Sequence, residues 1–238
     1  NQILHSLKKT LNQKSLISEK ASNQYQKDFK KISLDLLSAK SFLDWVNLYR
    51  KFIYWKIELM EIENNSMLNI LENQLKEANL LFGRFVKKNY LNWINSKENS
   101  PSMSHNVFKN KIIPNIKDSN STLLILIDNL RLDQWKIIEP LVSKYYNIQH
   151  EDLYCSILPT TTQYSRNSFF AGLTPNQIKN KFPDLWIDDI HKGNKNKHEK
   201  ELLSKQLESL DTEYESKYFK ITSLTSAKRM VENLNELK

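Results

Sequence analysis

A carboxylate and a run of hydroxyls follow two apolar segments of the sequence. Asp128 closes the segment TLLILID, while Thr160, Thr161 and Thr162 follow Pro159 in the segment SILPTTTQ. A carboxylate can hold a metal ion, and a metal ion lowers the pKa of a hydroxyl that it binds. The free N–H groups at the start of a helix attract anions. If these groups meet in the fold, they suit the attack of an activated threonine on a phosphate ester.

The same residues also have a purely structural interpretation. Threonine and aspartate are favoured at helix N-caps, so the stretch PTTTQ can be a cap after a turn. Asp128 can likewise cap a helix that begins near Leu130. The spacing alone leaves both interpretations open.

Strands are the elements expected to bring Asp128 and Thr162 together. Residues 122–128 are a short continuous apolar run, typical of a strand covered on both faces, and residues 152–158 and 217–222 are further candidate strands. Helical patterns alternate with these runs, which favours a mostly parallel sheet. Because ligands bind at the carboxyl ends of parallel strands, we expect the aspartate and the threonine at one edge of that sheet.

Two stretches carry clear helix signals. Residues 1–95 contain no proline and only Gly83, and their apolar residues recur at helical spacing, which predicts a bundle of three or four helices. Ser41 and Asp44 form an N-cap signature within this bundle. The helix that begins at Thr162 is expected to end at Gly172, since glycine suits the left-handed C-cap.

The aromatic residues of the bundle are expected in its core rather than at a cofactor site. A dimer interface formed by Trp45, Trp55 and Trp93 is the alternative. The side chains predicted to be buried are Phe29, Trp45, Tyr49, Phe52, Leu71 and Phe82.

Residues 96–121 are rich in Ser, Asn and Pro, which predicts a linker with one short helix near NVFKNKII. His105 lies in this linker and is expected to be solvated. The predicted organisation is therefore a helical bundle over 1–95, the linker, and part of an α/β domain over 122–238. The expected fold class is α + α/β, with a mostly parallel sheet.

Composition excludes several classes of protein. The 238 residues include one cysteine, so no internal disulfide can form, and a reducing compartment is favoured. No run of 18 apolar residues occurs, so no membrane span is expected. The net charge of +8 comes from 35 basic and 27 acidic residues that are spread over Lys- and Asn-rich segments. This pattern does not favour nucleic acid as the partner.

The segments LLILIDNLRLDQWKIIEPL and YCSILPTTTQYSRNSFFAGLTP resemble the PglZ domain, a branch of the alkaline phosphatase superfamily. The segments WVNLYRKFIYWKIELMEI and FGRFVKKNYLNW are similar to the helical middle region of PorX-type response regulators. The resemblance implies a cytoplasmic two-component protein linked to type IX secretion and gliding, with a receiver domain upstream. It also implies a phosphoester substrate, with a nucleotide-type phosphodiester as the candidate.

The resemblance also assigns roles to residues. Thr162, the second threonine of the Pro-Thr-x-Thr pattern, is implied as the nucleophile and as a zinc ligand. Asp128 is implied as a ligand of the same zinc ion. Thr160 and Arg166 are implied as contacts to the substrate.

Some of the family's pattern is missing. The family binds two zinc ions through further Asp and His residues, including an Asp-His-Gly that this sequence lacks. His191 and His198 lie in the basic stretch HKGNKNKHEK and are expected to be solvated. Arg131 and Asp133 are expected to form an ion pair or a cap. We expect the chain to be the middle of a longer protein, inactive by itself while its parent is active with zinc.

Three hypotheses of function follow. The first is the zinc-dependent phosphodiesterase or phosphatase output domain of a response regulator. The second is a non-catalytic signalling module that dimerises or docks a protein partner; a complete downstream set of metal ligands would favour the first over it. The third, a nucleic-acid-binding helical protein, would require steep salt dependence and has no groove-reading motif to support it.

Overall fold

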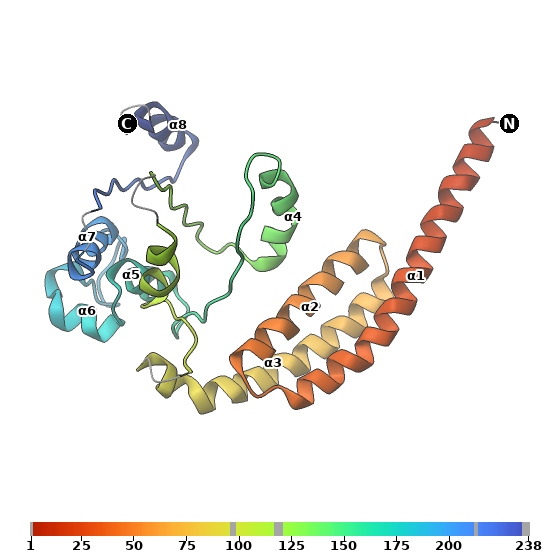
Figure 1. Cartoon of the computed structure of the whole chain (residues 1–238), viewed down its shortest axis with the longest axis horizontal. Coiled ribbons are helices and arrows are strands. Elements are labelled where there is room, and N and C mark those ends of the chain that lie inside the picture. The colour runs from red at the N-terminus through yellow and green to blue at the C-terminus, as the bar shows by residue number, and fades with distance from the viewer. Residues whose placement is uncertain (1, 96–98, 117–120, 212–213, 235–238) are drawn as a thin grey trace. The chain divides into compact units, whose positions relative to one another are not determined.

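The computed structural model describes residues 2–95, 99–116, 121–211 and 214–234. These residues divide into two compact units, each described by itself. Unit 1 contains residues 1–101 and 124–153, and unit 2 contains residues 102–123 and 154–238. Figure 1 shows the helices of both units along the chain.

Three long helices build most of unit 1. They are α1 (Gln2–Ser38), α2 (Phe42–Glu61) and α3 (Asn65–Ile94). They lie side by side, and the first turns of α1 extend past α2 and α3 (Figure 1). The predicted helical bundle over the first part of the chain is thus confirmed.

The turns between these helices are fixed by capping side chains. Ser41 Oγ accepts a hydrogen bond from the backbone N–H of Asp44 at 3.2 Å, and Asp44 Oδ2 accepts one from the backbone N–H of Ser41 at 2.8 Å. This capping box, expected from the sequence, starts α2 at Phe42, with residues 39–41 between it and the end of α1 at Ser38. Asn64 Oδ1 caps α3 by accepting from the N–H of Met67.

Aromatic rings fill the core of the bundle. The ring of Tyr25 lies 5.2 Å from that of Trp55, and the ring of Trp45 lies 5.3 Å from that of Phe82. Leu59 is fully buried in the same cluster. These residues come from all three helices, so the apolar stripes of the sequence meet in one core.

A buried amide adds a polar tie between α1 and α3. Gln74 is 4% exposed, and its Nε2 donates to the backbone carbonyl of Phe29 at 3.1 Å and to Ser33 Oγ at 2.8 Å. A buried donor must be paired, so these bonds restrict how α3 can slide along α1.

One residue that the sequence predicts to be buried, Tyr49, is exposed in the structure. Trp45, Phe52 and Leu71 are buried, and Phe29 and Phe82 are half-buried against the core, but Tyr49 is 40% exposed. Tyr49 lies two helical turns before Lys56, whose ammonium pairs with Asp133. This face of α2 therefore turns toward the start of α4 (Leu132–Val142) rather than toward α1 and α3.

Asp133 joins α4 to α2 inside unit 1. Its Oδ2 lies 2.9 Å from Lys56 Nζ, and its Oδ1 lies 3.0 Å from Arg131 Nε. The bond from Lys56 is the largest cause that lowers the pKa of Asp133, to about 2. The expected ion pair between Arg131 and Asp133 is confirmed.

Unit 2 is built from short helices. They are η1 (Phe108–Ile112), η2 (Ile113–Asn115), α5 (Thr162–Ala171), α6 (Pro175–Lys181), η3 (Pro183–Leu185), α7 (Glu199–Ser209) and α8 (Leu224–Leu234). Helix α5 packs against both α6 and α7. In the part of the chain that the structure describes, no helix is long and apolar enough to cross a membrane.

The expected sheet is wrong, and with it the α + α/β fold class. Residues 122–128, 152–158 and 217–222 have no regular strand, and among the described residues the only bridge is one isolated parallel pair between Met103 and Cys155. Several apolar side chains of these segments are exposed, including Ile125 at 69%. An apolar run predicts burial but not a pairing partner, and a strand forms only where another segment supplies its hydrogen bonds.

Replacing Leu59 by Ala should destabilise unit 1 by about 2–5 kcal/mol, because it leaves a cavity in the core. The matched control is Leu80→Ala on α3, where the side chain is 68% exposed and the loss should stay within about 0.5 kcal/mol. Urea unfolding followed by far-UV circular dichroism measures both. Equal losses for the two variants would contradict the core described here.

The depressed pKa of Asp133 predicts how unit 1 responds to acid. Its contribution to stability is present above the carboxyl's ordinary pKa of 3.8 and is lost as the pH falls toward about 2. Lys56→Met should raise the pKa of Asp133 toward its ordinary value. The unfolding free energy should then fall less between pH 5 and pH 2 than it does in the wild type. Lys88→Met, an exposed charge on α3, should leave the slope unchanged. Identical pH profiles for both variants would contradict the assignment.

Candidate functional site

Thr162 is the first residue of α5, as expected from the sequence, and it is half-buried. Thr161 takes the N-cap position in an extended conformation, and Thr160 is exposed. Within the described residues, the side chain of Thr161 makes no capping hydrogen bond. The backbone thus starts the helix here without the side-chain cap that the structural interpretation of PTTTQ requires.

The segment before the threonines is anchored inside unit 2. The backbone N–H of Cys155 donates to the carbonyl of Ser102 at 2.8 Å, and the N–H of Ile157 donates to Ser104 Oγ at 3.0 Å. Ile157 is 1% exposed. Burial raises the pKa of the Cys155 thiol to about 11, so this cysteine stays protonated at neutral pH and is a poor nucleophile.

The first turn of α5 is held from one side by the segment after η3. Gln163 Nε2 donates to the carbonyl of Ile187 at 2.8 Å, and Tyr164 Oη donates to Asp189 Oδ2 at 2.6 Å. The bond from Tyr164 is the largest cause that lowers the pKa of Asp189. Lys195 Nζ donates to the carbonyl of Asp189, which ties this segment to the next one.

Residues 194–196 hold α5 from a second direction. Asn196 Nδ2 donates to the carbonyl of Thr162 at 3.2 Å and to Asn167 Oδ1 at 3.0 Å. Asn167 in turn donates from Nδ2 to the carbonyl of Lys195 at 3.2 Å. Asn196 is 8% exposed and Asn167 is 1% exposed, so these bonds are shielded from water.

A buried carboxylate lies beside this pair of amides. Glu199, the first residue of α7, is 1% exposed, and its Oε2 accepts from Arg166 Nη2 at 2.7 Å and from Tyr218 Oη at 2.7 Å. Lys220 Nζ donates to the same oxygen at 3.0 Å. Burial and the bond to Glu199 raise the pKa of Tyr218, so the phenol keeps its proton and remains a donor.

These contacts bear on the expected role of Arg166. One nitrogen of its guanidinium is already bound to Glu199, and the side chain is 18% exposed. The fold therefore uses this arginine to compensate a buried charge. A contact between Arg166 and a phosphate stays a prediction.

Asp128 lies in a turn of unit 1, is exposed, and is followed by Asn129 in a left-handed conformation with φ 59°. Thr162 belongs to unit 2. The expected approach of these two side chains to one zinc ion therefore stays a prediction. Over the described ranges, no group of three or more His, Cys, Asp or Glu residues is arranged to hold a metal ion.

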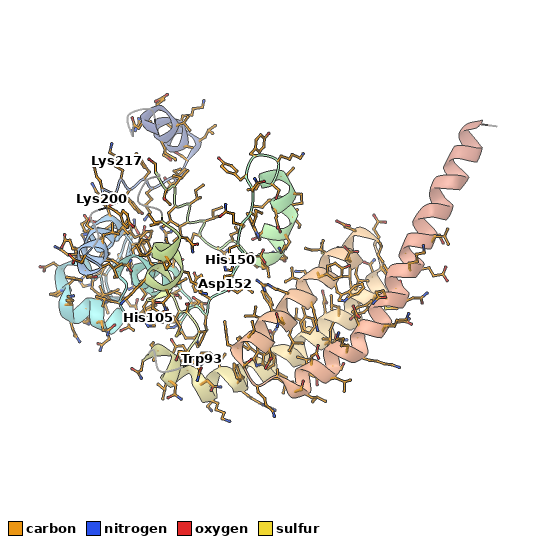
Figure 2. The ribbon with its side chains drawn as sticks, viewed as in Figure 1. Trp93, His105, His150, Asp152, Lys200 and Lys217 are labelled. Carbon is orange, nitrogen blue, oxygen red and sulfur yellow. The ribbon has the colours of Figure 1, made fainter. Side chains whose placement is uncertain are left out.

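The expectation for His105 is wrong. It is 7% exposed in unit 2, and burial lowers the pKa of its imidazole. Its side chain is labelled in Figure 2. The neighbouring residues Met103 and Ser104 are also buried, and Ser104 Oγ accepts the hydrogen bond from the backbone N–H of Ile157. The polar composition of the predicted linker did not indicate this burial, because the partner segment is about 50 residues away in sequence.

Sequence reasoning did not single out Asn196 and Glu199, which lie in the basic stretch HKGNKNKHEK. A signal for Glu199 exists, since it shares the helical spacing of the buried residues Leu202, Leu203 and Gln206. A carboxylate on such a face predicts a buried partner cation. For Asn196 the sequence holds no comparable signal, because its partners are α5 groups fixed only by the fold.

Comparison with protein families finds two domains in the chain. Residues 107–232, more than half of the sequence, match the BREX system PglZ alkaline phosphatase-like domain. The chain belongs to the PglZ alkaline phosphatase-like family. Residues 15–94 match the PorX response regulator linker domain, and this match covers α2, α3 and α1 from residue 15 onward. The resemblance drawn from the sequence is confirmed.

No curated protein matches the chain. The PglZ match includes α5 with its threonines and the residues 194–199 that hold it. The buried polar cluster around Asn167, Asn196 and Glu199 therefore lies within the phosphatase-like domain.

Gly172 ends α5 in a left-handed conformation with φ 64°, as expected for a C-cap glycine, and Gln206 packs against it. Gly172→Ala should lower the opening free energy of α5 by about 1–2 kcal/mol or more, because a Cβ is strained at this φ and meets the Gln206 amide. Native-state hydrogen exchange of the α5 amides measures the change.

Gly83→Ala in α3 is the matched control. An added Cβ there meets nothing within 4 Å, so the protection of the α3 amides should rise by about 0.5–1 kcal/mol. A loss of protection in both helices, or in neither, would contradict the distinct environments of these glycines.

Proposed function

We propose that this chain is the output region of a PorX-type response regulator and acts as a phosphodiesterase or phosphatase with Thr162 as its nucleophile. The observation that carries the proposal is the position of Thr162 at the start of α5, inside the PglZ match. The first turn of α5 is held by hydrogen bonds on two sides. A fixed nucleophile at the start of a helix, where the helix dipole favours negative charge, is an arrangement that suits phosphoryl transfer.

Thr162, Thr160 and Arg166 would each have a separate role in the reaction. The hydroxyl oxygen of Thr162 would form a bond to phosphorus and lose its proton to water, while the alcohol of the ester leaves with its bridging oxygen. Water would then hydrolyse the phosphothreonine and restore the hydroxyl. The positive end of the α5 dipole would stabilise the negative oxygens of the transferring phosphoryl group. Thr160, exposed just before the helix, would contact the substrate. Arg166 would add positive charge one turn into α5, in the place where Glu199 already orients it.

Zinc is the metal proposed for the domain, with Asp128 and Thr162 as two of its ligands. Zinc sites usually draw three or four protein ligands, and the described residues offer no such group by themselves. Asp128 and Thr162 alone thus do not fit a complete zinc site. We propose that further ligands from the natural polypeptide complete a site for two zinc ions.

The proposal extends to the setting of the protein. The linker domain of residues 15–94 would transmit a signal from an upstream receiver domain to the PglZ domain. Such a regulator would be cytoplasmic and would serve type IX secretion and gliding. A nucleotide-type phosphodiester is the proposed substrate.

Replacing Thr162 by Ala in the natural polypeptide should reduce hydrolysis of bis(4-nitrophenyl) phosphate, with zinc present, by at least about a thousandfold. Thr161→Ala should change the rate less than about threefold, because the Thr161 side chain makes no cap bond and Thr162 remains. Release of 4-nitrophenol measures both. Asp128→Ala should lower both the zinc content and the rate.

A clear result would contradict the assignment. If Thr162→Ala keeps the rate, Thr162 is not the nucleophile. If the wild type shows no hydrolysis with zinc, the protein is better described as a signalling module. If the polypeptide is active but loses no activity on zinc chelation, the proposed metal is wrong.

A further inference from the structure

A buried amide contacts the backbone of the proposed nucleophile from outside its helix. Asn196 lies before α7, and its Nδ2 donates to the carbonyl of Thr162 at 3.2 Å. The second hydrogen of the same nitrogen reaches Asn167 Oδ1, since the two nitrogen–oxygen distances are 3.2 and 3.0 Å. Both donors of this amide are therefore used on α5.

The amide itself has little freedom. The backbone N–H of Asn196 donates to Asn194 Oδ1 at 3.0 Å, and its carbonyl accepts from Lys220 Nζ at 3.0 Å. Asn167 returns a bond to the carbonyl of Lys195. Because Asn196 is 8% exposed and Asn167 is 1% exposed, water cannot readily replace these bonds.

We infer that Asn196 is a positioning residue that fixes the backbone of Thr162, and through it the direction of the threonine hydroxyl. The inference rests on the proposed function, because it needs Thr162 to be the nucleophile. Thr162 is the first residue of α5, and helix ends fray unless something outside the helix holds them. Asn196 is that outside contact at the residue that would react.

The expected effect concerns the rate rather than binding. A nucleophile displaced by about 1 Å loses about a hundredfold in rate, although the substrate still binds. Asn196→Asp keeps the size of the side chain but removes both donors and places an acceptor against two oxygens. Asn196→Ala removes the donors and leaves space.

The chain offers a closely matched control in Gln206. It is 2% exposed, and its Nε2 donates to the carbonyls of Phe169 and Phe170 at 3.0 and 3.1 Å. Gln206 thus makes the same kind of buried bonds to the same helix, but at the end far from Thr162. A role in stability alone predicts similar behaviour for Asn196 and Gln206.

The experiment measures kcat and KM for bis(4-nitrophenyl) phosphate in the natural polypeptide with zinc, for wild type, Asn196→Asp, Asn196→Ala, Gln206→Ala and Thr162→Ala. We expect both Asn196 variants to lose about ten- to a hundredfold in kcat, with KM and zinc content changed less than about twofold. Gln206→Ala should lower the melting temperature as much as Asn196→Ala does while keeping kcat within about threefold.

The possible results distinguish failure of the positioning role of Asn196 from failure of the proposed function. If Thr162→Ala abolishes the rate but both Asn196 variants keep it, the positioning role is overturned and the proposed function stands. If Gln206→Ala loses as much kcat as Asn196→Ala, the effect is structural and the positioning role is again overturned. If Thr162→Ala keeps the rate, the proposed function fails, and the inference fails with it because no nucleophile remains to be positioned.

Discussion

The carboxylate of Glu199 is the constraint on which unit 2 depends. A carboxylate that is 1% exposed is tolerated only when donors compensate its charge, and here Arg166, Tyr218 and Lys220 all reach the same oxygen. These donors come from α5 and from the segment after α7. One buried charge thus brings together three parts of the chain that do not pair in a sheet.

The contacts around Glu199 also help to fix the position of the start of α5. Asn196 lies three residues before Glu199, so anchoring the carboxylate also sets the amide that contacts Thr162. On the other side of α5, the carbonyl of Ile187 accepts a hydrogen bond from Gln163, and the carboxylate of Asp189 accepts one from Tyr164. A helix start held by hydrogen bonds is more specific in position than one held by apolar packing, because each bond requires a direction as well as a distance.

Unit 1 is stabilised mainly by an apolar core. Its core is aromatic and comes from α1, α2 and α3, while buried Gln74 fixes the register of two of these helices. Its match to a response regulator linker suits such rigidity, since long packed helices transmit small displacements well. Helix α4 joins this unit through Asp133 and Lys56, so a segment far along the chain becomes part of the bundle.

The sequence by itself determined the helices and their caps. The apolar stripes of α1, α2 and α3, the Ser41 capping box, and the α5 boundaries at Thr162 and Gly172 depend on neighbours within a few residues, and all are read from local spacing. The family was also readable, because its motifs are contiguous. Tertiary structure alone decided that the apolar run at 122–128 has no strand partner among the described residues, that His105 is buried, and that Asn196 and Glu199 hold α5. Each of these depends on groups tens of residues away, and no local pattern specifies which distant donor will meet a buried acceptor.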